Sequence, residues 1–273
     1  MPTIEANGIR LYYEQHGWEN ESADVLVLSN GILMSSASWA YQTPVLSKRY
    51  RLLLYDCRGQ WQSDHPSGPY SMELHADDLA ALLNVLGVER AHIGGISYGA
   101  ELSLVFARKY PHKTRSLIVA SAVSQVDPVL NGLMGGWIAA TRARDPQLLY
   151  QVVYPLTFSD AWIAANQPAL DAALARYATL DFDALLELLL SFSQLNETAE
   201  LHHIAAPTLV IASELDILKP RRYAEIIARE IPQAELAVVP NAGHAACWEQ
   251  PVLFNALLLG FLALQSSRPE STN

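Results

Sequence analysis

The sequence predicts an α/β protein with a mostly parallel β-sheet, helices on both faces and an inserted helical block. Strand-like and helix-like segments alternate over residues 1–124, which is the pattern of βαβ units and therefore of a covered parallel sheet. The alternation stops over residues 125–201, where only helical patterns occur, and it resumes over residues 202–273. We therefore expect residues 1–124 and 202–273 to form one core, with residues 125–201 inserted as a helical lid.

Each element of the core can be predicted from local patterns. Asn7-Gly8 lies between two short strand-like runs and predicts a hairpin turn. Later buried strands are expected in "DVLVLSN", "RLLLYD", "RAHIGGIS", "RSLIVASA", "APTLVIASELD" and "AELAVVPNAGH". Helical spacing follows in "SMELHADDLAALLNVLG" and "ELSLVFARKYP", and the inserted block carries "LMGGWIAATRARDPQLLYQVV", "DAWIAANQPALDAALARYATL" and "DFDALLELLLSFSQLN".

Composition narrows the function classes. The chain has 273 residues, of which 51% are hydrophobic, and a formal net charge of −10. This acidity opposes phosphate backbones and anionic membranes, so neither nucleic acid nor membrane is expected as a partner. No leader-like or membrane-spanning pattern is seen, which favours a cytoplasmic location. The two cysteines, Cys57 and Cys247, lack metal-site spacing, and we expect no metal and no cofactor.

The stretch "RAHIGGISYGAELSL" carries the first chemical signal. Ser97 follows a buried strand and precedes a helical pattern, within the motif G-x-S-x-G. Gly95 and Gly99 lack a Cβ and permit the close backbone approach that a tight strand-to-helix turn requires. The free N–H groups at the start of the helix favour developing negative charge. Ser97 is therefore the candidate nucleophile.

A serine needs a base, and the base needs an acid that orients it. His244, in the loop "PNAGHAACW" after the last predicted strand, is the best candidate base. Asp216, after the preceding strand, is the favoured acid, with Glu214 and Asp127 as alternatives. The other histidines are less suitable: His92 lies in a buried strand, His202 and His203 precede a strand, and four are expected in turns or helices on the surface, namely His16, His65, His75 and His112.

These motifs resemble those of the α/β-hydrolase fold family. The matching pieces are the "NG" after the third strand, "YDCRGQWQSD", "GISYGA", "SELDILKP" and "NAGHAACWEQP", and they cover nearly the whole chain. The chain resembles the lid-bearing group that includes 3-oxoadipate enol-lactonases, small carboxylesterases, cofactor-free haloperoxidases and carbon–carbon bond hydrolases. The resemblance implies a Ser-His-Asp triad in the family's chain order, formed by Ser97, Asp216 and His244.

The same resemblance implies an oxyanion hole built from the backbone N–H groups of Ile32 and Tyr98. The sequence departs from the family pattern at two positions. Asn30 stands where a histidine generally precedes the glycine, and this changes how the loop is held. Trp61 stands where relatives commonly have a glycine, which can alter packing near the strand-to-helix turn. Neutral drift and a substrate-related reason are equally good interpretations of both departures.

The resemblance and the residues together predict hydrolysis of a carboxylic ester or lactone of a small hydrophobic substrate. Met34 and aromatic residues of the predicted lid could line the pocket, namely Trp137, Tyr154, Phe158 and Trp162. Carbon–carbon bond hydrolysis is an alternative. The segment "NGILMSSASW" also resembles the acyltransferase that joins 3-hydroxyacyl chains into rhamnolipid precursors. A further alternative is a non-catalytic receptor for a small ligand, against which the presence of all three triad candidates argues.

Overall fold

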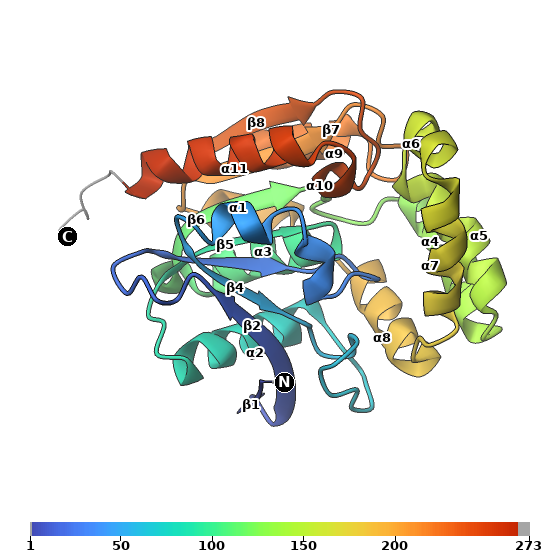
Figure 1. The fold of residues 1–273 in the computed structure, drawn as a ribbon, viewed down its shortest axis with the longest axis horizontal. Helices are drawn as coiled ribbons and strands as arrows, with labels where there is room; N and C mark the ends of the chain where they lie inside the picture. Colours follow the sequence, from blue (N-terminus) through green and yellow to red (C-terminus); the bar gives the residue numbers. More distant parts are fainter. Residues whose placement is uncertain (1, 267–273) are drawn as a thin grey trace.

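The computed structural model describes residues 2–266, so the end of the predicted 202–273 segment lies outside the described residues. An eight-stranded sheet runs through the centre in the order β1-β2-β4-β3-β5-β6-β7-β8 (Figure 1). Its strands are β1 (Thr3–Ala6), β2 (Ile9–His16), β3 (Val25–Ser29), β4 (Arg51–Tyr55), β5 (Ala91–Ile96), β6 (Thr114–Ala120), β7 (Thr208–Ser213) and β8 (Ala234–Val239).

The sheet is mostly parallel, as the sequence predicts. Strands β1 and β2 pair antiparallel, β2 pairs antiparallel with β4, and the remaining neighbours pair in parallel. Every residue of β3, β5 and β7 is buried. Parallel strands that are covered on both faces require such continuous burial, which explains why these segments do not alternate in hydrophobicity.

The hairpin at the start of the chain forms at the predicted turn. Asn7 and Gly8 adopt φ values of 50° and 76° between β1 and β2. A two-residue turn with both central residues at positive φ matches the twist of the flanking strands, and Asn-Gly tolerates it best. Local chemistry alone therefore fixes this connection.

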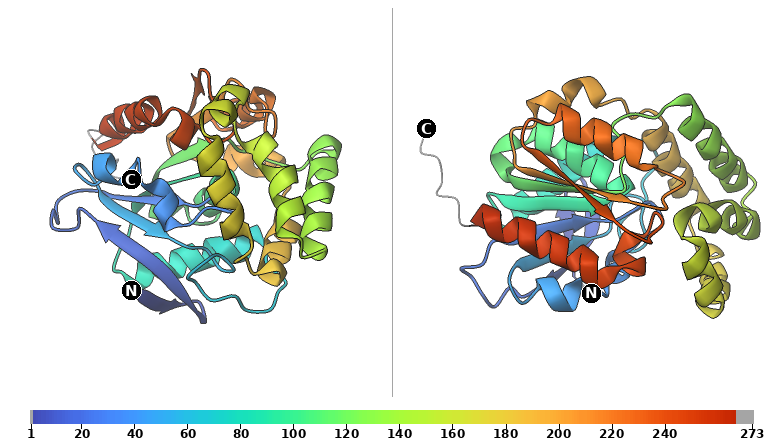
Figure 2. Two further views of the ribbon diagram at one scale, coloured as in Figure 1. Left: turned by 45° about the vertical axis from the view of Figure 1, so that its right-hand side comes forward. Right: turned by 90° about the horizontal axis from the view of Figure 1, so that it is seen from above.

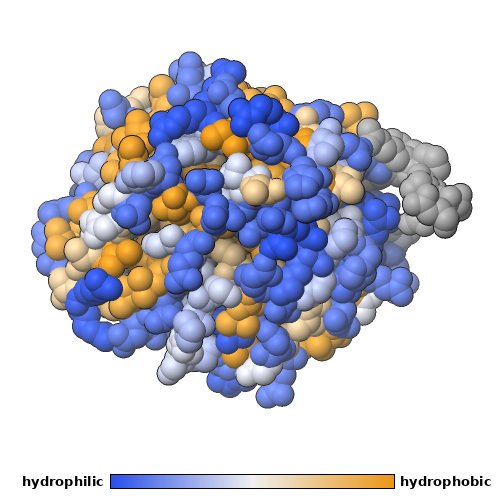
Figure 3. Space-filling view, turned by 180° about the vertical axis from the view of Figure 1, so that it is seen from behind, coloured by the Kyte–Doolittle hydropathy of each residue, from blue (hydrophilic) through white to orange (hydrophobic). Residues whose placement is uncertain are grey.

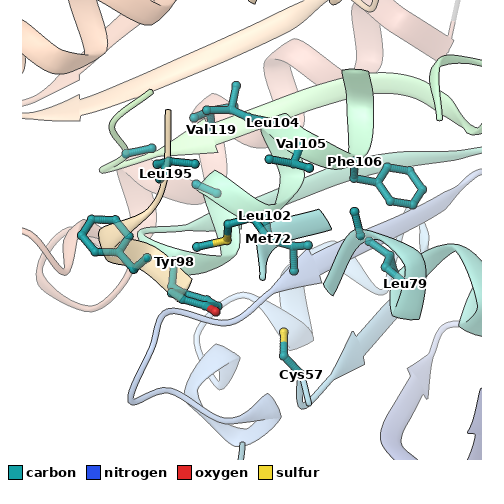
Figure 4. Close-up of a cluster of buried hydrophobic side chains, with 14 of the residues drawn as sticks. Cys57, Met72, Leu79, Tyr98, Leu102, Leu104, Val105, Phe106, Val119 and Leu195 are labelled. Carbon is teal, nitrogen blue, oxygen red and sulfur yellow. The ribbon is translucent and has the colours of Figure 1, made fainter. Parts of the chain in front are cut away.

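Helices cover both faces of the sheet. One face carries α2 (Met72–Val85), α3 (Tyr98–Lys109) and α9 (Arg221–Glu230), and the other carries α1 (Thr43–Leu46), α10 (Ala246–Glu249) and α11 (Pro251–Ser266). Short 3-10 helices occur at Ser36–Trp39, Pro111–Lys113 and Thr198–His203. Figure 4 shows part of the first layer, where Phe106 of α3 lies near Leu79 of α2.

Five α-helices lie between β6 and β7 in the chain, and we call them the helical insertion. They are α4 (Pro128–Arg142), α5 (Pro146–Thr157), α6 (Asp160–Ala165), α7 (Gln167–Tyr177) and α8 (Phe182–Ser193). Asp127, Asp145, Ser159 and Asp181 cap the starts of four of them by accepting backbone N–H groups. The views agree that the insertion stands beside the carboxyl ends of the parallel strands (Figures 1 and 2).

One side of the surface carries separate hydrophobic patches rather than one large apolar face (Figure 3). The side opposite to that of Figure 1 is mainly hydrophilic, with separate hydrophobic patches (Figure 3). Such scattered apolar patches are ordinary for folded chains. Within residues 2–266, no helix combines the length and the hydrophobicity needed to cross a bilayer.

Candidate active site

Ser97 lies at the sharp turn between β5 and α3. Its backbone adopts φ 55° and ψ −124°, a conformation that non-glycine residues rarely take. The Ser97 N–H donates to the carbonyl oxygen of Ala120 over 2.8 Å, which ties the turn to β6. A strained residue held by its surroundings at the end of a strand is often functional. The turn holds Ser97 at the carboxyl edge of the sheet.

His244 and Asp216 meet beside this edge. Nδ1 of His244 lies 2.8 Å from Oδ2 of Asp216, and both side chains are buried. The other oxygen of Asp216 accepts the backbone N–H groups of Leu218 and Lys219. Burial raises the pKa of Asp216, but His244, the backbone N–H of Lys219 and the charge of Lys219 outweigh it and hold that pKa below its usual value. The carboxylate therefore occupies Nδ1 of His244 and leaves Nε2 to act on another group.

The two alternative acids lie elsewhere. Asp127 caps α4 and accepts the hydroxyl of Tyr223, while Glu214 accepts the backbone N–H of Asn241. Of the three candidates, Asp216 is the one hydrogen-bonded to His244 in the structure. Each of the other two carboxylates is engaged with residues other than His244.

The expectation that His75 lies on the surface is wrong. Its side chain is buried between α2 and α3, and Nε2 is hydrogen-bonded to the hydroxyl of Tyr98 over 2.7 Å. Burial and the nearby Arg58 guanidinium lower the pKa of His75 to about 3. The helical spacing of residues 72–85 showed a helix, but the face on which a single polar residue lies depends on the packing of α3.

Ser97 and His244 line one cavity of about 260 Å³ beneath the helical insertion. Met34, Trp137, Tyr154, Phe158 and Trp162, the five candidate pocket residues, also line it. Its aromatic side chains stack in pairs: the ring centroids of Phe158 and Trp162 are 4.1 Å apart, and those of Tyr150 and Tyr154 are 4.8 Å apart. The walls are therefore apolar and preformed, as in sites that bind hydrophobic small molecules.

Cys247 also lines the cavity, yet it is poorly suited to act as a nucleophile. Its thiol is fully buried, and burial raises its pKa to about 12. The thiolate is the reactive form of cysteine, so this side chain acts as a small apolar wall.

Asn30 holds the loop after β3 through its side chain. Its amide donates to the carbonyl oxygen of Tyr55 and to Asp56, and its oxygen accepts the indole N–H of Trp39. Gln60 fixes the next two residues by donating to the carbonyl oxygens of Gly31 and Ile32. The Asn30 side chain therefore ties the loop to Tyr55, Asp56 and Trp39.

The backbone N–H groups expected to form the oxyanion hole lie in this loop and at the start of α3. Within residues 2–266, no hydrogen bond uses the N–H of Ile32 or of Tyr98. Tyr98 is anchored by its side chain, because its hydroxyl is bound to His75. Ile32, Ser97 and Tyr98 line a second, smaller cavity together.

Trp61 connects the core with the helical insertion. Its backbone has φ 41°, in the left-handed region that glycine adopts most easily. The guanidinium of Arg176 in α7 lies 3.9 Å from the Trp61 ring centroid and donates to Ser35. Both Trp61 and Arg176 line the large cavity, so this contact joins the two sides of its wall.

Sequence reasoning missed one charged pair. Nζ of Lys219 lies 2.6 Å from Oε1 of Glu101 and 3.2 Å from Oγ of Ser97. Burial raises the pKa of Glu101, which the Lys219 ammonium and the N–H of Val123 oppose. One signal was present: Glu101 is the single charged residue in the first two turns of an otherwise mostly apolar helix, and it lies one turn after Ser97.

These observations define the class of the protein. The α/β-hydrolase fold family model matches residues 24–251, and the chain belongs to this family. It is an α/β hydrolase with a serine at the strand-to-helix turn and a histidine–aspartate pair beside it.

The relatives narrow the comparison further. The chain is 34% identical over 262 residues to the "Putative carbamate hydrolase RutD" of Stutzerimonas stutzeri (strain A1501), an alignment that covers 93% of this chain and 97% of the relative. The crystal structure of MGS-M2, an α/β hydrolase enzyme from a Medee basin deep-sea metagenome library, matches with a TM-score of 0.92 and 30% identity, covering 100% and 99% of the two chains.

A third similarity supports the fold alone. The enol-lactonase from Burkholderia xenovorans LB400 matches with a TM-score of 0.90 at 24% identity, and the match covers 96% of this chain and 100% of that one. Backbone likeness at this level of identity says nothing about which side chains do chemistry.

Proposed function

We propose that the chain is a serine hydrolase that cleaves a carboxylic ester or lactone of a small hydrophobic substrate through an acyl-enzyme on Ser97. One observation carries the proposal: Ser97 and His244 line the same apolar cavity, and Asp216 binds the opposite nitrogen of His244. This is the arrangement that nucleophilic catalysis by serine requires. The helical insertion would act as the lid of this cavity.

The chemistry follows from these positions. His244 Nε2 takes the proton of Ser97 Oγ as the oxygen attacks the substrate carbonyl carbon, and the carbonyl electrons move onto its oxygen. The N–H groups of Ile32 and Tyr98 stabilise this oxyanion. The protonated His244 then gives its proton to the leaving alkoxide. Water, activated by the same imidazole, hydrolyses the acyl-enzyme and restores Ser97.

The cavity supports a hydrophobic substrate. Its volume of about 260 Å³ and its stacked aromatic walls fit an apolar acyl or alcohol group. A carbamate is the second candidate substrate, because the S. stutzeri relative carries that name. A carbamate carbonyl reacts with serine by the same steps, but a very small polar carbamate would leave the apolar walls unused.

Pre-steady-state kinetics tests the proposal. We expect p-nitrophenyl esters of increasing acyl length to give a burst of nitrophenol followed by steady release, and the acyl length with the highest kcat/KM to report the size of the cavity. Ser97→Ala should abolish the burst, and His244→Gln should slow it strongly. A p-nitrophenyl carbamate in the same series measures the second candidate, and added 3-hydroxy acids reveal transfer to an alcohol. Equal slow rates for wild type and Ser97→Ala with every donor would reject the proposal.

A further inference from the structure

The proposed triad does not use two buried charged side chains, of which one contacts its serine and the other contacts the first. Lys219 follows β7, and Glu101 lies in the first turn of α3. The Lys219 side chain is 3% exposed and that of Glu101 is 0% exposed. Nζ of Lys219 donates to Glu101 over 2.6 Å and to Oγ of Ser97 over 3.2 Å. The cation of a buried ion pair is therefore hydrogen-bonded to the proposed nucleophile.

Stability alone is a weak reason for such a pair. Removing two charges from water costs free energy that their mutual attraction often fails to repay, and apolar replacements of buried pairs are frequently neutral or stabilising. Oε2 of Glu101 accepts no hydrogen bond within the part of the chain that the structure describes, so the carboxylate is also incompletely satisfied. A role in function explains the presence of this buried pair better than a role in stability does.

Lys219 is hydrogen-bonded to two members of the proposed triad, Asp216 and Ser97. Its backbone N–H donates to Asp216 over 2.8 Å, and its side chain donates to Ser97. The Nζ also lies over the ring of Phe192, 4.7 Å from its centroid, in a cation–π contact. The loop that presents the acid thus also delivers a positive charge to the nucleophile.

A small cavity connects this charge with the expected oxyanion donors. Its volume is about 20 Å³, and Ile32, Ser97, Tyr98, Glu101 and Lys219 are among its lining residues. A space of this size holds about one oxygen-sized group. An oxygen held there by the N–H groups of Ile32 and Tyr98 would share a wall with the ammonium.

We propose that Lys219 is a further catalytic residue, whose ammonium stabilises the negative charge that develops around Ser97 Oγ during acylation, and that Glu101 is the positioning residue that holds it there. This inference rests on the proposed function. Lys219 acts as a donor and keeps its proton throughout: Ser97 Oγ accepts from Nζ and gives its own proton to His244 Nε2. The carbonyl oxygen that becomes the oxyanion gains a cationic neighbour in addition to two backbone donors.

A double-variant comparison separates catalysis from structure. Lys219→Met removes the ammonium and leaves the buried carboxylate of Glu101 without its cationic partner, so it loses both kcat and stability. Lys219→Met combined with Glu101→Gln removes both charges and should recover much of the lost Tm. The inference predicts that the double variant keeps kcat roughly 10- to 100-fold below wild type, the range for a hydrogen bond to a charged group, with KM changed about twofold or less because neither residue lines the large cavity.

A matched control uses a buried ion pair away from Ser97. Arg58 and Asp78 are joined over 2.7 Å, with side chains 9% and 2% exposed. Arg58→Met combined with Asp78→Asn should change Tm while leaving kcat near that of wild type. If the Lys219 and Glu101 double variant does not fold, the two single variants Glu101→Gln and Lys219→Gln are compared instead. Glu101→Gln retains the ammonium, so its kcat should be at least about tenfold higher than that of Lys219→Gln.

The outcomes are distinct. A folded double variant with wild-type kcat, or equal kcat losses in Glu101→Gln and Lys219→Gln that follow their Tm, would overturn the role of Lys219. Ser97→Ala, measured with the same p-nitrophenyl ester, tests the proposed function separately. If Ser97→Ala is inactive while the double variant is fully active, the serine mechanism stands and the Lys219 inference fails. If Ser97→Ala is as active as wild type, the serine mechanism itself fails.

Discussion

Gly95 and Gly99 touch across the turn that carries Ser97. A Cβ placed on Gly95 would lie 2.5 Å from the carbonyl carbon and oxygen of Gly99, and one placed on Gly99 would lie 2.2 Å from the carbonyl oxygen of Ser29. Both contacts are with backbone atoms, which cannot move aside as a flexible side chain can. The two glycines therefore hold β3, β5 and the start of α3 at the separation that brings Ser97 out of the sheet edge.

Gly95→Ala is expected to displace this turn. We predict a loss of about 2 kcal/mol or more in the free energy of unfolding, because the added methyl overlaps backbone on a buried strand, and a loss of at least about 100-fold in kcat/KM, because misplacement of a nucleophile by about 1 Å has that cost. Urea unfolding and ester hydrolysis measure the two effects.

Gly136→Ala is the control for this substitution. Gly136 lies inside α4, and a Cβ there meets no atom within 4 Å. Alanine should stabilise the helix by up to about 1 kcal/mol and leave hydrolysis unchanged. If Gly95→Ala behaves like Gly136→Ala, the close approach at the turn does not constrain the site.

Asp216→Asn should remove the orientation of His244 while preserving the shape of the side chain. We expect kcat to fall by about 10³- to 10⁴-fold, the size of effect known for the aspartate of serine triads. Glu214→Gln and Asp127→Asn should each leave kcat within about twofold of wild type, because these carboxylates bind Asn241 and Tyr223 instead. A larger loss in either control than in Asp216→Asn would assign the acid to a different residue.

Local patterns predicted the path of the chain well, because strand burial, helix caps and the Asn7-Gly8 turn depend on neighbouring residues. The order of strand, Ser97 and helix was likewise a local signal. The contact of His244 with Asp216 could be anticipated because both residues follow adjacent parallel strands, whose carboxyl ends share one edge.

Contacts between distant segments could not be predicted in this way. Lys219 reaches Ser97 across 122 positions of sequence, and Arg176 reaches Trp61 only because α7 folds back toward the loop after β4. His75 was assigned to the wrong face for the same reason: its partner Tyr98 lies on a neighbouring helix. Pairings of this kind depend on how the helices pack, which the period of a single helix does not record.

Trp61 offers a test of backbone strain against side-chain packing. Both Trp61→Gly and Trp61→Ala lose the stack with Arg176, which contributes about 0.5–2 kcal/mol. Only glycine also relieves the positive φ of 41°, which costs an L-residue about 1–2 kcal/mol. We therefore expect Trp61→Gly to be about 1 kcal/mol more stable than Trp61→Ala in urea unfolding.

The reverse order is expected at a helical position of ordinary geometry. Leu148 is 40% exposed and lies in the first turn of α5. At this position Leu148→Ala should be about 1 kcal/mol more stable than Leu148→Gly. The same order at Trp61 and Leu148 would show that the backbone at Trp61 carries no strain.

His75 predicts a specific acid sensitivity of the fold. Its pKa of about 3 in the folded protein lies below that of an exposed histidine, about 6.5, because the neutral ring is buried next to Arg58. Between these values the unfolded chain binds a proton that the folded chain does not. Stability is therefore lost as the pH falls from about 6.5 toward about 3, and is fully present above that window.

His75→Gln should remove this component while keeping a polar partner for the hydroxyl of Tyr98. Between pH 7 and pH 4.5, wild type should lose about 2–3 kcal/mol more of its free energy of unfolding than the variant does. Urea unfolding at the two pH values measures the difference, and His92, which is buried and unchanged in both proteins, contributes equally to each. If wild type and variant lose the same free energy of unfolding between the two pH values, His75 gains no proton on unfolding. The ring would then already be charged in the folded protein.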